Sequence, residues 1–243
     1  MKIDGRSADR FARAPNKSCV LVYGPDQGLV RERSRAMLQS VLGKDIGDPF
    51  RMTELTGAQV GSSAGALMDE AAALSLIGGR RVVRVIAAGD GQAEAFAALL
   101  HARAGRAPDQ ESLVVAEAGE LGPRSALRRL FEESAEGASV ACYADEGDGL
   151  MSFAESALGS LGHTVDQAAL EWMARALGGD RSIIRRELEK LSTYVGPSNP
   201  VTVADVEACL GDSAEIDVDD AAVAAATGDL AGLDRAVARS YSA

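Results

Sequence analysis

Short apolar runs that end at turn residues alternate with amphipathic stretches over residues 1–144. The clearest run, Ser18 to Tyr23 (SCVLVY), stops at Gly24-Pro25-Asp26 and predicts a buried strand that enters a turn. Further strands are predicted at 50–55, 81–87, 112–116 and 138–143, and helices at 28–42, 64–74, 93–103 and 125–133. Because strands that alternate with helices need crossover connections, this part of the chain is predicted to be an α/β domain with a parallel sheet.

The pattern becomes helical after an acidic loop at residues 145–148. Helical spacing covers 150–161, 167–177 and 182–194, a proline-containing break follows at 197–200, and Thr202 is the expected N-cap of a helix at 203–210. Residues 145–211 are therefore predicted to form a small all-helical domain. Residues 212–243 hold an acidic connector and two short alanine-rich helical patterns. They are too short to build a core, so we expect them to be the start of a third domain.

Composition supports a helix-rich protein with free cysteines. Hydrophobic residues make up 47% of the chain but aromatic residues only 4%, so alanine, leucine and valine must supply the core. Cys19, Cys142 and Cys209 lack the spacing of a zinc or redox site, and neither His101 nor His163 has a ligand partner nearby in sequence. We expect no metal. No signal peptide or membrane span is visible, which predicts a soluble cytoplasmic protein that does not contact a membrane.

Charge is divided unevenly along the chain. The net charge is −11, and the residues after position 140 carry 18 acidic but only 7 basic side chains. This balance argues against a nucleic-acid footprint over the whole surface, so any DNA contact must be local. The one basic cluster of the helical domain lies on a segment that we interpret first as a solvated helix with internal ion pairs, and second as a contact to a phosphate backbone. Its members are Arg181, Arg185, Arg186 and Lys190.

The strand, turn and helix around residues 20–35 lie where a phosphate-binding loop would be. A Walker A pattern that starts at Gly24 requires Gly, Lys and Ser or Thr at the positions of Leu29, Val30 and Arg31, so the lysine and the magnesium ligand are both missing. The strand at 81–87 also lacks a terminal carboxylate, since Asp90 comes too late. We therefore expect a degenerate nucleotide site, no cofactor and no hydrolysis. An active P-loop ATPase is the alternative.

Two other features are candidates for a functional role. Glu117 ends a predicted strand, and we interpret it as a solvated cap rather than a catalytic base. Leu74, Leu76 and Ile77 precede Gly78-Gly79 at the end of a predicted helix. Core packing would explain Leu74, but the adjacent Leu76 and Ile77 cannot both face inward from a helix. An exposed apolar pair suggests a contact to a partner protein.

The ordered set of these segments resembles the delta subunit of the bacterial DNA polymerase III clamp loader. The resemblance rests on residues 73–85 (ALSLIGGRRVVRV), 112–132 (SLVVAEAGELGPRSALRRLFE), 141–143, 177–194 (LGGDRSIIRRELEKLSTY), 205–206 and 211–212. It implies a RecA-like AAA+ domain with a degenerate nucleotide site at 1–144, a helical lid domain at 145–211 and the start of a truncated helical collar domain at 212–243.

The resemblance also implies a function. A delta subunit is a non-catalytic part of the polymerase III holoenzyme that binds and opens the sliding clamp (the beta subunit) without hydrolysing ATP itself. Its other expected partners are the gamma/tau and delta prime subunits, reached through the collar, and primer-template DNA. By motif position, Leu76 and Ile77 correspond to the hydrophobic pair that enters the clamp, with Leu74 beside them. The family often has phenylalanine at the position of Ile77.

Overall fold

The computed structural model describes residues 1–3, 5–143, 147–177, 180–210 and 225–227. Two compact units divide the chain, residues 1–144 and residues 145–243, and each is described here by itself. The expectation of a partial third domain at 212–243 falls almost wholly outside the described residues.

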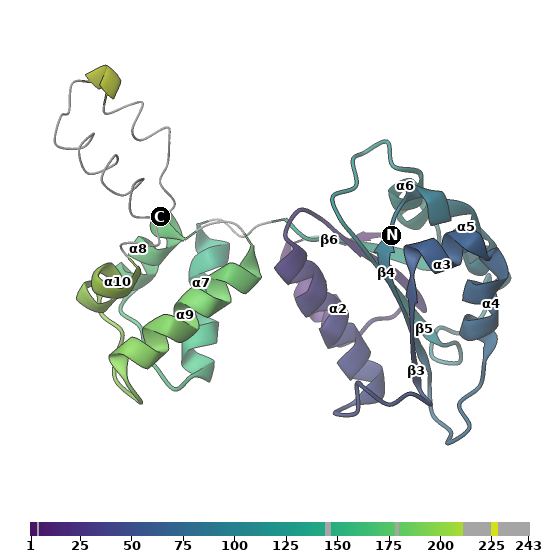
Figure 1. Cartoon of the computed structure of the whole chain (residues 1–243), viewed down its shortest axis with the longest axis horizontal. Helices are drawn as coiled ribbons and strands as arrows, with labels where there is room; N and C mark the ends of the chain where they lie inside the picture. Colours follow the sequence, from purple (N-terminus) through teal and green to yellow (C-terminus); the bar gives the residue numbers. More distant parts are fainter. Residues whose placement is uncertain (4, 144–146, 178–179, 211–224, 228–243) are drawn as a thin grey trace. The chain divides into compact units, whose positions relative to one another are not determined.

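The first unit is built on a six-stranded, wholly parallel sheet, so the predicted α/β class is confirmed (Figure 1). Its order from edge to edge is β1 (Lys2–Ile3), β6 (Gly137–Ala141), β2 (Cys19–Tyr23), β5 (Leu113–Ala118), β4 (Val82–Ala88) and β3 (Met52–Thr56). The first long strand, β2, therefore lies between strands that come late in the sequence. Because the strands are parallel, the loops that follow β2, β4, β5 and β6 lie together at the carboxyl ends of the strands.

Helices cover both faces of this sheet (Figure 1). On one face lie α1 (Gly5–Arg13) and α2 (Gln27–Leu42), and on the other lie α3 (Gly57–Ser62), α4 (Ala64–Ala72), α5 (Ala93–Ala102) and α6 (Ala126–Glu133), with a short 3₁₀ turn at Asp90–Gln92. Side chains of β2 alternate between the two cores, with Val20 and Val22 on the α2 face and Leu21 and Tyr23 on the other. All are buried, which explains why the strand appeared in the sequence as a continuous apolar run.

Four elements differ from the predictions. Helix α1 was not predicted, and neither was β1, because a two-residue strand carries no local pattern. It is held instead by long-range bonds such as those from the Met1 amino group to the carbonyls of Phe131 (2.9 Å) and Gly137 (3.1 Å). Helix α3 was also missed, although Thr56 and Gln59 form a capping box at its start. Helix α4 ends at Ala72, two residues earlier than predicted.

In the described residues of the second unit, four helices pack around one core. They are α7 (Asp148–Ser160), α8 (Gln167–Ala176), α9 (Arg181–Val195) and α10 (Val203–Leu210). The predicted N-cap of α10 is present, since the Thr202 hydroxyl accepts from the Asp205 amide at 3.4 Å while the Asp205 carboxylate accepts from the Thr202 amide at 3.0 Å. His163 is buried and bonded through both ring nitrogens to the Asn199 carbonyl and the Ser192 hydroxyl. It is a packing residue.

Among the described residues there is no helix with the length and apolarity to cross a bilayer. The same residues include no cluster of three or more potential metal ligands.

Candidate functional site

The loop between β2 and α2 has the position of a phosphate-binding loop, but its backbone amides are used internally. The Gly24 amide donates to the Gly119 carbonyl at 3.1 Å, and the Asp26 amide to the Cys142 carbonyl at 3.4 Å. The loop is thus tied to the ends of both neighbouring strands, β5 and β6. Gly24 is required for this approach, because a Cβ atom there would lie 1.9 Å from the Cys142 carbonyl oxygen.

A carboxylate occupies the amino terminus of α2. The buried side chain of Asp26 accepts from the Leu29 amide at 2.8 Å and caps the helix. In a phosphate loop this end of the helix, with its free amides and positive dipole, receives the anionic phosphate. Here a negative side chain already fills that role and would repel a second anion. The loop therefore departs from a phosphate cradle in geometry as well as in sequence.

Glu117 is not the solvated cap that the sequence suggested. Its carboxylate is buried on the α2 face and accepts two hydrogen bonds from the Arg84 guanidinium, at 2.6 and 2.8 Å, and another from the Ser34 hydroxyl. Arg84 also donates to Glu54 at 2.8 Å, and the hydrogen bond to Glu117 raises the pKa of Arg84. A carboxylate with these partners is committed to a buried ion pair that joins α2, β4 and β5. Burial escaped the prediction because the partners come from distant segments.

At the amino ends of the strands lies a loop that joins α4 to β4. We call residues 73–79 the apolar loop. Leu74, Leu76 and Ile77 all follow the end of α4, and their exposed fractions are 89%, 89% and 64%. The interpretation of Leu74 as a core residue is therefore wrong, because the helix ends too early to turn it inward. The Gly78 amide donates to the Ser75 carbonyl at 3.3 Å and closes a turn that presents Leu76 and Ile77.

Both ends of the apolar loop are anchored. Before it, the Ala71 carbonyl accepts from the buried Ser112 hydroxyl at 2.7 Å. After it, the Arg51 guanidinium donates to the Arg80 carbonyl at 3.2 and 3.3 Å and to the Val41 carbonyl at 2.9 Å. Gly78 and Gly79 have φ of 80° and 82°, a conformation that glycine adopts without strain. Fixed ends and a defined turn reduce the entropy that a binding partner would have to remove.

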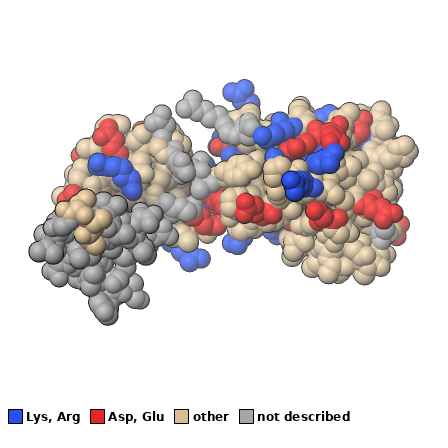
Figure 2. All heavy atoms as spheres, turned by 90° about the horizontal axis from the view of Figure 1, so that it is seen from above, with Lys and Arg blue, Asp and Glu red and all other residues tan. Residues whose placement is uncertain are grey.

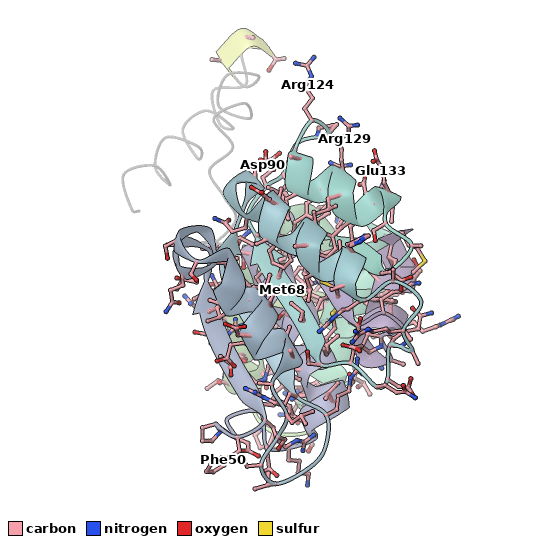
Figure 3. The ribbon with its side chains drawn as sticks, turned by 90° about the vertical axis from the view of Figure 1, so that its right-hand side faces the viewer. Phe50, Met68, Asp90, Arg124, Arg129 and Glu133 are labelled. Atoms are coloured by element: carbon pink, nitrogen blue, oxygen red, sulfur yellow. The ribbon has the colours of Figure 1, made fainter. Side chains whose placement is uncertain are left out.

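Sequence reasoning missed an exposed aromatic residue at the same end of the sheet. Phe50 was expected to begin a strand, but it precedes β3 in a turn and is 53% exposed. It lies at the end of the unit opposite Asp90 and Arg124 (Figure 3). Its neighbour Arg51 binds the base of the apolar loop, so the two loops are linked. The only sequence signal was the Gly47-Asp48-Pro49 turn before it.

Of the four predicted DNA-contact residues, Arg181 is buried and the other three are exposed. Arg181 is buried, with its guanidinium 4.5 Å from the centre of the Phe153 ring, and Arg185 lies over the same ring at 5.4 Å. Arg181 as a surface contact is therefore a wrong prediction. Arg186 and Lys190 are exposed one helical turn apart, and Lys190 pairs with Glu187 at 2.6 Å.

The surface of the first unit is mixed in charge. On its face in Figure 2, lysine and arginine side chains lie among aspartate and glutamate rather than in a continuous basic tract. A nucleic-acid footprint of the extended kind is not visible on that face.

A parallel sheet of this order, with helices on both faces and a small helical unit after it, is the fold of RecA-like AAA+ proteins. No protein-family model matches the sequence, and no curated protein matches it. Solved structures do show the fold.

One of these structures is a Bacillus subtilis DNA clamp loader delta protein (YqeN). It is similar to this chain with a TM-score of 0.60 and 16% identity, over 96% of this chain and 71% of that one. Two single-residue variants of Thermotoga maritima RuvB each give a TM-score of 0.51 at 12% identity, over 84% of this chain and 65% of RuvB. At such identities the likeness defines the fold alone.

Proposed function

We propose that this chain is a delta-type clamp-loader subunit, which binds a sliding clamp through the apolar loop and opens the ring without hydrolysing nucleotide itself. The observation that carries the proposal is the apolar loop: three large apolar side chains are held out in water by a turn with anchored ends. Isolated exposed apolar residues are ordinary, but a preorganised group of three is typical of a protein contact. The likeness to a DNA clamp loader delta protein suggests that the partner is a sliding clamp.

Ring opening would follow from binding energy. A ligand shifts an equilibrium between closed and open rings only by the difference between its affinities for the two states. Leu76 and Ile77 would supply that difference if their pocket on the clamp were best formed when the neighbouring ring interface is distorted. No chemical step in this chain is then needed.

The alternative function is that of an active, nucleotide-driven AAA+ protein. Two observations weigh against it: the loop amides at Gly24 and Asp26 bond to neighbouring strands, and the Asp26 carboxylate caps α2. We expect neither tight ATP binding nor turnover. Turnover above background that is abolished by substitution of Asp26 or Arg31 would support the alternative.

The remaining partners belong to the assembled loader. The gamma/tau and delta prime subunits would be contacted through the collar, which falls outside the described residues. Contact with primer-template DNA would use the exposed Arg185, Arg186 and Lys190 rather than the buried Arg181. Both are expectations for the complex and not for the isolated chain.

Co-elution with the sliding clamp of the same organism tests the proposal directly. The full chain is mixed with the clamp and passed over a size-exclusion column, with and without ATP. We expect a complex in both cases, and accelerated release of clamps preloaded on a nicked circular plasmid. Absence of a complex at micromolar concentrations, or a complex that forms only with ATP, would contradict the proposal.

A further inference from the structure

A cavity of about 540 Å³ lies directly beside the apolar loop. The ends of α4 and α5 form its walls together with residues 73–75, residues 79–81 and side chains from the segment 103–112. Met68 on α4, which Figure 3 labels, also lines it. Leu74 and Ser75, which belong to the apolar loop, also line it. Four arginines share this one cavity: Arg80, Arg81, Arg103 and Arg106.

These four arginines outnumber the two carboxylates that line the cavity with them, Asp109 and Glu111. Glu111 serves two of them, with its oxygens 3.7 Å from Arg103 Nε and 3.1 Å from Arg106 Nη1. Arg81 pairs with Glu70 at 3.0 Å. Arg80 donates only to the carbonyls of Pro108 and Glu111, both at 2.7 Å, and no carboxylate of the described residues lies within ion-pairing distance of it.

The surroundings of Arg80 disfavour its positive charge. Burial, followed by the positive charge of Arg103, lowers the pKa of the Arg80 guanidinium, and the negative charge of Asp109 offsets this only in part. A negative group in the cavity would offset both effects. Arginine is well suited to receive one, because its planar fork binds a carboxylate through two parallel hydrogen bonds.

Two polar atoms of the lining residues are buried without a partner. Within the described part of the chain, neither the Ser75 hydroxyl oxygen nor Arg81 Nε forms a hydrogen bond. Buried polar groups are nearly always satisfied in folded proteins, so these two atoms mark the walls of the cavity as incompletely hydrogen-bonded in the free chain. This observation is independent of the charge count.

We propose that the cavity receives an acidic side chain from the same protein that binds the apolar loop. This inference rests on the proposed function, and it adds the chemistry of the partner: an apolar pocket with a carboxylate beside it. A protein that binds Leu74 lies against one wall of the cavity, since Leu74 and Ser75 line it. Desolvating a surplus of arginine charge without a counter-charge would oppose binding, so the occupant must bring one.

Arg106→Ala tests the inference with little risk to folding, because this side chain is 61% exposed. Arg129→Ala is the matched control: Arg129 is 62% exposed and also pairs with a glutamate, Glu133 at 3.5 Å. It lies near Arg124, at the end of the unit opposite Phe50 (Figure 3). The measurement is the Kd for the sliding clamp by surface plasmon resonance at several salt concentrations.

We expect Arg106→Ala to raise Kd about tenfold at low salt and to flatten its salt dependence, as for a lost interfacial charge pair. Arg106→Lys should retain much of the affinity, and Arg106→Glu should lose more than Arg106→Ala. Arg129→Ala should bind as the wild-type chain does.

The outcomes separate the two levels of the proposal. If alanine at Leu76 and Ile77 abolishes binding but Arg106→Ala and Arg106→Glu behave like the Arg129 control, the acidic contact is wrong and the proposed function stands. If the alanine pair leaves binding intact, the proposed function itself fails. Thermal stabilisation of the free protein by millimolar phosphate that Arg106→Ala removes, with clamp binding unchanged, would assign the cavity to a small anion and overturn the inference.

Discussion

Replacing Leu76 and Ile77 together by alanine should leave the fold nearly as stable as before and remove most of the affinity for the clamp. Full burial of a leucine or isoleucine side chain is worth about 1.5–3 kcal/mol. The folded chain leaves 89% of Leu76 and 64% of Ile77 exposed. Folding therefore buries only about a tenth of the Leu76 side chain and about a third of the Ile77 side chain. The double substitution should lower the free energy of unfolding by less than about 1.5 kcal/mol.

Binding should respond much more strongly. If the clamp pocket buries the parts of both side chains that the free chain leaves in water, their loss should cost about 2–4 kcal/mol. That corresponds to a rise in Kd of about 30- to 900-fold. The stability change and the affinity change thus differ enough to be measured separately.

Urea unfolding followed by circular dichroism and a Kd titration against the clamp form the assay. Leu67→Ala provides the opposite control, because Leu67 is fully buried in the same helix that precedes the apolar loop. It should cost about 2–5 kcal/mol of stability. A stable double variant with an unchanged Kd would refute the role of the loop, and a loss of stability close to that of Leu67→Ala would show that both residues pack in the core.

Three further predictions concern the interior. Glu117→Gln breaks the buried pair with Arg84 and should lower the free energy of unfolding by about 3 kcal/mol in urea titrations; a change below about 1 kcal/mol would mean that water already screens the pair. Arg181→Ala should lower the thermal midpoint because its guanidinium stacks on a ring, whereas Arg186→Ala should not, and equal effects would argue against the burial of Arg181. Burial raises the pKa of the Cys19 thiol to about 12, so the folded state keeps a proton that the unfolded state releases above about pH 8.5. Stability should be complete below that pH and fall between about pH 9 and 12, less steeply in Cys19→Ala; identical pH profiles would contradict this.

Local pattern determined the elements whose signals lie within one segment. The strand at 18–23 was predictable because both of its faces are buried, which makes every residue from Cys19 to Tyr23 apolar. The helices of the second unit were predictable from the spacing of their apolar residues. The N-cap role of Thr202 was predictable because a capping bond joins residues only three positions apart. The missing Walker A lysine at Val30 was likewise a matter of reading one position.

Tertiary structure alone decided the state of individual side chains. Glu117 looked like a strand-end cap, yet Arg84 and Ser34, which lie 33 and 83 positions before it, form hydrogen bonds to its carboxylate. Arg181 looked like part of a basic face, but Phe153 from α7 covers it. A residue's neighbours across a fold are set by topology, and no spacing along one segment encodes them.

The apolar loop shows both contributions in one place. Two adjacent apolar residues before Gly78-Gly79 predicted exposure of at least one of them, because they were expected at the end of a helix, where neighbours cannot both face the core. Both are exposed for a different reason, since α4 ends at Ala72 and a turn carries them. The early end of α4, the anchors at Ser112 and Arg51, and the arginine-lined cavity beside the loop required the structure. Each depends on contacts between segments that only the folded sheet brings together.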